Sequence, residues 1–110
     1  MNAPKPAWLT EPCPPWCTAT HQQQVIEADR RHEGDLTVVP VIVRQPPTDT
    51  SSNHLPAEPR TGEVDVTAFR DLATPETWVV IAEGPQSIEF TRESAIRVSL
   101  ALTELLRQTA

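Results

Sequence analysis

Glycine and cysteine are both scarce in this chain, and each scarcity excludes a class of protein. The 110 residues contain three glycines, too few for the glycine-rich loops that cradle phosphates or dinucleotides. The two cysteines indicate metal ligands or free thiols in a reducing compartment rather than a disulfide framework. A nucleophile elbow and a paired-histidine metalloprotease motif are also missing. The sequence therefore predicts a protein that is not an enzyme.

Long hydrophobic runs and excess positive charge are missing too. No stretch approaches the roughly 20 apolar residues that span a bilayer, and residues 1–6 lack the apolar centre of a signal peptide. The formal net charge is -6, so no general field attracts nucleic-acid phosphates or anionic lipid surfaces. We expect a cytoplasmic protein with no membrane association, for which nucleic acid is not the expected partner.

Proline, by contrast, is abundant, and its distribution suggests the domain organisation. The chain contains 12 prolines, which favour extended connections over regular structure. Residues 1–12 lack apolar periodicity and are predicted to be a flexible tail that docks through Trp8 and Leu9. Residues 13–110 are predicted to form a single zinc-stapled domain. Within it, residues 44–61 are predicted to form a long polar loop.

The periodicity of the remaining chain predicts an α+β fold, with a small antiparallel sheet of three to four strands packed by one C-terminal helix. Strand patterns occur at 36–43, 62–70, 77–82 and 86–90, and a helical pattern occurs at 92–107. Pro40 lacks a backbone N–H, so the first strand should lie at a sheet edge or carry a bulge. Thr91 is a suitable helix N-cap.

The predicted helix is amphipathic. Its apolar stripe, which we expect to pack on the sheet, comprises Ala95, Val98, Ser99, Leu102, Leu105 and Leu106. Ile96 and Leu100 lie on a flank of this stripe. They are predicted either to contact the N-terminal block or to form a patch that binds a protein partner, so that the chain is a monomer or a weak homodimer through Ile96 and Leu100.

Four potential zinc ligands are concentrated near the N-terminus. Cys13, Cys17 and His21 follow one another at intervals of four residues, and His32 comes after a longer gap. Two prolines after Cys13 can begin a short helix, which would place Cys17 and His21 on the same face. Two thiolates and two imidazoles suit tetrahedral zinc. The sequence therefore predicts an N-terminal zinc knuckle with a structural role.

Other interpretations of these residues stay open. The cysteines can be reduced, buried thiols next to surface histidines, or Cys13 and Cys17 can form a disulfide. If His32 does not bind, Asp29, Glu33 or a water can take the fourth position. An open metal position would permit a zinc-dependent hydrolase. Whether the metal site is fully closed therefore decides between a structural and a catalytic role.

The function predicted from these features is a zinc-binding accessory or regulatory protein that acts as a protein-interaction module. Arg30 and Arg31, with His32 beside them, make the one local basic cluster, so a nucleic-acid-binding regulator from a mobile element is an alternative. Trp16 lies between the two cysteines, where it can shield the thiols or pack the knuckle on the sheet.

The motif CPPWC, with histidines following at His21 and His32, resembles a family of short uncharacterised actinobacterial proteins of unknown function. Their pattern is CPxWC-x3-H followed by a second histidine, a small sheet and a C-terminal helix. Val39-Pro40-Val41 and residues 95–106 match the later parts of that pattern. The resemblance implies an accessory role and supplies no activity.

Overall fold

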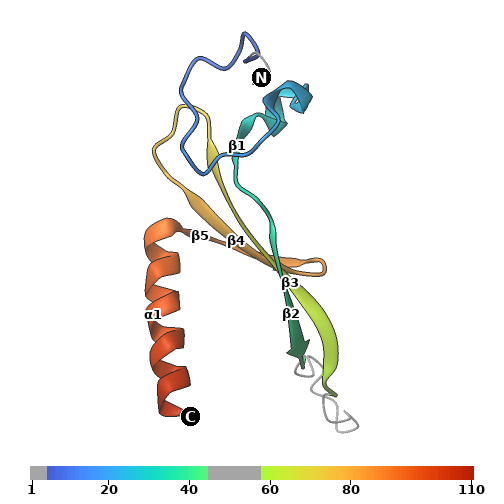
Figure 1. The fold of residues 1–110 in the computed structure, drawn as a ribbon, viewed down its shortest axis with the longest axis vertical. Coiled ribbons are helices and arrows are strands. Elements are labelled where there is room, and N and C mark those ends of the chain that lie inside the picture. The colour runs from blue at the N-terminus through green and yellow to red at the C-terminus, as the bar shows by residue number, and fades with distance from the viewer. Residues whose placement is uncertain (1–4, 45–57) are drawn as a thin grey trace, which may run out of the picture.

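The computed structural model describes residues 5–44 and 58–110, which form five strands, two short 3-10 helices and one α-helix (Figure 1). In chain order the elements are η1 (His21–Gln23), η2 (Glu27–Asp29), β1 (Arg31–Glu33), β2 (Thr37–Val43), β3 (Arg60–Asp71), β4 (Trp78–Glu83), β5 (Gln86–Thr91) and α1 (Arg92–Gln108). Among these described elements, no helix is both long and apolar enough to cross a bilayer.

The five strands form one antiparallel sheet organised around β3. Two short strands share one side of β3, with β1 on its C-terminal end and β2 on its N-terminal part, while β4 and then β5 follow on the other side. This arrangement confirms the predicted α+β fold. The sequence pattern missed β1, because its three residues, Arg-His-Glu, carry no apolar alternation.

Several local predictions are confirmed by the sheet. Pro40 lies opposite Glu63 in β2, which pairs with β3 alone among the described strands and is therefore an edge strand. Gly84 takes a positive φ of 57° in the two-residue turn between β4 and β5, a conformation that glycine adopts without steric cost. The predicted polar loop is shorter than expected, because β3 already begins at Arg60. Residues 45–57 of that loop lie outside the described part.

The C-terminal helix begins where predicted, but it does not cover the sheet. The Thr91 side chain accepts a hydrogen bond from the Ser94 N–H and caps α1. Beyond Ala95 the predicted packing is wrong, because Val98, Leu102 and Leu105 are 44%, 53% and 54% exposed. The physical reason is that β5 ends at Thr91 and α1 starts at the next residue. Without a connecting loop the chain does not turn back over the sheet, and the helix diverges from the strands (Figure 1).

Very little of the sheet is covered by the other residues that the structure describes. Among the described hydrophobic residues only Leu9 and Phe69 are buried, each 7% exposed. The radius of gyration is 18.6 Å, against about 13 Å for a compact domain of this length. The best-buried part of the chain is therefore the junction between the N-terminal block, residues 5–33, and the end of β3.

Candidate metal centre

Backbone hydrogen bonds fix the N-terminal block on the end of the sheet. The Thr18 N–H donates to the Glu33 carbonyl over 2.8 Å, and the Gly34 N–H donates to the Ala68 carbonyl over 2.9 Å. The helix predicted after Cys13 is wrong, because the chain makes only a turn there before η1. Pro14 precedes another proline, which disfavours the helical conformation.

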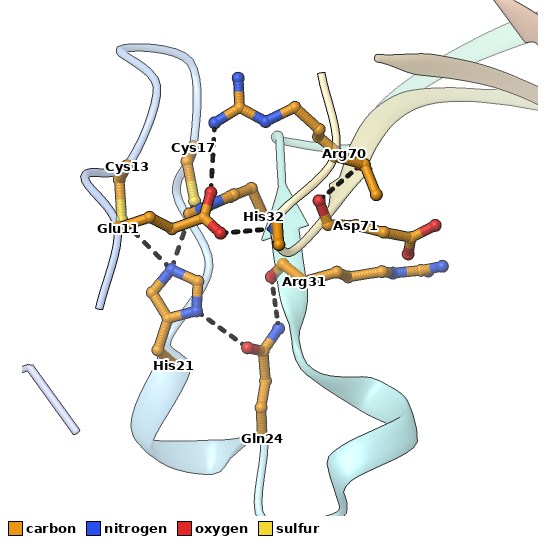
Figure 2. A network of polar contacts seen from close by, with 11 residues as sticks. Glu11, Cys13, Cys17, His21, Gln24, Arg31, His32, Arg70 and Asp71 are labelled. Atoms are coloured by element: carbon orange, nitrogen blue, oxygen red, sulfur yellow. Dashed lines mark hydrogen bonds and ion pairs between the residues drawn. The ribbon is translucent and has the colours of Figure 1, made fainter. Parts of the chain in front are cut away.

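The four predicted ligands nevertheless converge. The side chains of Cys13, Cys17, His21 and His32 each offer a ligand atom, and these atoms lie within 4.8 Å of one another. His21 Nε2 is 3.3 Å from the Cys13 sulfur and 3.6 Å from the Cys17 sulfur (Figure 2). A tetrahedral ion with bonds of about 2.3 Å to sulfur and about 2.0 Å to nitrogen requires separations of about 3.5 Å between such atoms. The geometry is therefore that of a site able to hold one metal ion.

The ring of His21 is oriented by a glutamine. His21 Nδ1 donates to Gln24 Oε1 over 2.8 Å, and the amide nitrogen of Gln24 donates to the Arg31 carbonyl over 2.9 Å. This second bond fixes which end of the amide faces the imidazole. The His21 proton is therefore placed on Nδ1, and the lone pair of Nε2 is directed toward the two sulfurs.

His32 is the most deeply buried of the four ligands, with no exposed surface. Its Nε2 donates to Glu11 Oε2 over 3.0 Å, whereas its Nδ1 is buried and has no hydrogen-bond partner. A buried polar atom without a partner carries a desolvation cost that a bound cation would remove. Strand β1 holds this ring in place, because His32 pairs with Arg70 of β3.

Glu11 supports the site, and the sequence analysis missed it. Its carboxylate accepts from His32 and, over 2.6 Å, from the N–H of Ala73, which has a positive φ of 60°; Arg70 lies 3.6 Å away. The Ala73 N–H, followed by the His32 ring, holds the pKa of the Glu11 carboxyl below its usual range. A carboxylate that orients a ligating histidine is a common feature of metal sites. Glu11 lies in the predicted tail and has no motif spacing that marks it.

Both cysteines are free thiols and half-buried. Burial, with the neighbouring Cys17 thiol as the next cause, raises the pKa of the Cys13 thiol. A thiolate at Cys13 is therefore unfavourable unless a cation lies beside it. A bound metal ion supplies the compensating positive charge, and it displaces the thiol protons when it binds.

The two acidic residues considered as alternative ligands lie apart from this cluster. Glu33 accepts from Arg31 over 2.7 Å, and Asp29 is exposed in η2. Two tryptophans pack in this region, Trp8 against a ligand and Trp16 against the sheet end. The ring of Trp8 stands edge-on to His21 at 5.7 Å between centroids, and Trp16 packs against Gly34, where a Cβ would lie 3.5 Å from the indole.

Comparison with known proteins identifies the family and nothing more. No curated protein and no solved structure is significantly similar to the chain. One family of domains, described as a domain of unknown function (DUF6907), matches residues 2–110. The match includes all four ligands, Glu11 and the C-terminal helix. Because it covers nearly the whole chain, this protein belongs to the DUF6907 family.

Proposed function

We propose that the chain is a non-enzymatic accessory or regulatory module whose N-terminal block is held by structural zinc. One observation carries the proposal: two sulfurs and two imidazole nitrogens converge, and each imidazole already has its other nitrogen hydrogen-bonded. Soft thiolates combined with imidazoles in a tetrahedral arrangement favour zinc over the hard cations, which prefer oxygen. The zinc would join the cysteine loop to η1 and β1.

The closed donor set supports a structural rather than a catalytic role. Catalytic zinc has three protein ligands and an open position for water or substrate. Here four protein ligands are available, and His32 is fully buried. The predicted hydrolase would need one of them to leave the metal, and no observation favours that.

Nucleic-acid binding is also disfavoured, because both arginines of the basic cluster are engaged within the chain. Arg30 donates to the Gln24 carbonyl over 3.1 Å and lies 4.7 Å from the centroid of the Trp8 ring. Arg31 is paired with Glu33 at 2.7 Å. Phosphate recognition would have to displace these contacts. We therefore retain protein interaction as the role of the module.

Metal analysis with X-ray absorption spectroscopy tests the zinc site. We expect one equivalent of zinc in protein purified under reducing conditions, with a first shell of two sulfurs and two nitrogens. An Asp29→Asn variant should keep the same stoichiometry and spectrum, because Asp29 is exposed and outside the cluster. A shell in which a water oxygen replaces one protein ligand would overturn the structural assignment, and metal-free protein would overturn the site itself.

A Glu11→Gln variant tests how much the hydrogen bond from His32 to the Glu11 carboxylate contributes to zinc affinity. We expect a 10- to 100-fold loss of zinc affinity, roughly the range found when such supporting groups are removed, because a neutral amide orients the His32 ring less strongly. Competition against a chromophoric chelator measures the affinity. Glu27→Gln is the matched control, since Glu27 is exposed in η2. Equal affinity in the two variants would show that Glu11 does not support the site.

A further inference from the structure

One face of the sheet is apolar across four strands and is not buried. Strand register places alternate residues of β2, β3, β4 and β5 on this face. Val39 and Ile88 on this face are 40% and 52% exposed, and its other members are at best half-buried. We call it the apolar sheet face; it comprises Val39, Val41, Val64, Val66, Ala68, Val79, Ile81, Ile88 and Phe90. An open groove of about 610 Å³ runs over its end near Trp16.

The helix carries a matching apolar surface that is also uncovered. Ala95, Val98, Leu102 and Leu105 follow the spacing i, i+3, i+7, i+10, which places them on one line along α1 and is the spacing of helices that pack on a partner. We call this line the helix seam. Only Ala95 is half-buried, and the other three are exposed. The fold thus contains both halves of a hydrophobic core, and they do not meet.

Most charged side chains near these surfaces point away from them, although the Arg60–Glu83 ion pair shares the register of the apolar sheet face, at the start of β3 and the end of β4. On α1 the ion pairs Glu93–Arg97 and Glu104–Arg107 lie on the side opposite the seam. On the sheet, the acidic residues Glu63, Asp65 and Glu89 project from the other face, since they occupy the alternate register positions. Two chains of net charge -6 can therefore meet through the apolar surfaces while Glu63, Asp65 and Glu89 point outward and Glu83 stays paired with Arg60.

We propose that the apolar sheet face and the helix seam are covered by a second copy of this chain, the helix of each copy packing on the sheet of the other. A partner that supplied only a helix would leave the seam uncovered, and one that supplied only a sheet would leave the sheet face uncovered. A second copy supplies both, and the two contacts are then related by a two-fold axis, as in most homodimers.

The size of the two surfaces fits this arrangement. A helix of 17 residues is about 25 Å long and about 10 Å wide, and four strands of about six residues cover roughly 20 by 20 Å. Together they present a flat projected area of roughly 650 Å² per copy. The solvent-accessible area is larger, because side chains protrude from both surfaces. Standard stable interfaces bury about 800 Å² of accessible surface per partner.

This dimer differs from a weak association through Ile96 and Leu100. Those two side chains are 42% and 65% exposed. Their predicted place on a flank of the apolar stripe is wrong, because at 100° per residue they lie on the charged side of α1, away from the seam. The contact also does not include the metal ligands. The dimer proposal therefore goes beyond the zinc proposal. Measuring zinc content and molecular mass on the same sample tests the two proposals separately.

Sedimentation equilibrium of the wild-type chain is the decisive test. We expect a species of twice the 12.2 kDa chain mass at micromolar concentration, and a melting temperature that rises with protein concentration, as linkage to dimerisation requires. A zinc-loaded wild-type chain that sediments as a monomer, with a melting temperature independent of concentration, would overturn the proposal.

A pair of variants on α1 tests whether the helix seam forms the dimer contact. Leu102→Glu places a charge in the seam and is expected to lower the dimer affinity at least 100-fold, so that it sediments as a monomer or unfolds. Thr103→Glu adds the same charge at an exposed neighbouring position off the seam and should stay dimeric. A dimer that survives Leu102→Glu, or that is lost equally in Thr103→Glu, would show that another surface holds the copies together.

Discussion

Removal of zinc is expected to lower the melting temperature of the wild-type chain by roughly 20 °C or more, or to abolish its cooperative unfolding. Structural zinc sites of this donor type supply on the order of 10 kcal/mol or more of binding free energy, which is available only to the folded state. Each kcal/mol moves the melting temperature of a domain of this size by about 4–8 °C. With only Leu9 and Phe69 buried among its described hydrophobic residues, the chain has little other stabilisation.

Thermal melts with and without a strong chelator, followed by circular dichroism under reducing conditions, measure this effect. A Cys13→Ser, Cys17→Ser double variant is the control. It should melt at the temperature of the chelated wild type and should not respond to chelator, because both sulfur ligands are missing. If the wild type keeps its full melting temperature in chelator, the interpretation of the four residues as a metal centre is wrong.

Phe69→Ala is expected to destabilise the chain by about 3–5 kcal/mol, the usual cost of truncating a buried phenylalanine. Phe69 is one of the two buried hydrophobic residues in the described part of the chain, and the Arg31 guanidinium lies 4.2 Å from the centroid of its ring. The same part of β3 pairs with β1, whose His32 faces the metal centre. The substitution therefore leaves a cavity next to the strands that position a candidate metal ligand.

Urea unfolding of zinc-saturated protein, followed by tryptophan fluorescence, gives the free energy of unfolding. Ile42→Ala is the matched control, because Ile42 is 78% exposed although it lies on the same face of the sheet as Phe69. That variant should lose less than about 1 kcal/mol. If the two variants lose equal stability, Phe69 is not the hydrophobic anchor of the junction.

The large expected effects of zinc removal and of Phe69→Ala have one cause, which is the small hydrophobic core of the described chain. A domain near 100 residues buries a limited fraction of its surface, and additional constraints such as metals then matter more. Here the candidate metal centre lies in the N-terminal block, while the apolar sheet face and the helix seam are left largely exposed in the described residues. The zinc and the second copy would thus replace parts of the core that a single chain does not build.

The sequence by itself predicted four of the five strands, the C-terminal helix and the cluster of four potential metal ligands. Alternating valines in β3, the glycine-containing turn after Glu83 and the Thr91 cap act over a few residues, so they predict the strands, the hairpin and the start of α1. The spacing of Cys13, Cys17 and His21 likewise indicates a metal site without knowledge of the fold, because thiols and imidazoles at short intervals have few other uses.

Only the tertiary structure decided which distant groups meet. Glu11 contacts His32 from 21 positions away and Ala73 from 62, and no local pattern encodes such a contact. The β1 strand forms because the end of β3 offers hydrogen-bond partners, not because Arg-His-Glu prefers a strand. The amphipathic pattern of α1 predicts an apolar face but not what covers it, since that depends on the direction in which the chain leaves β5.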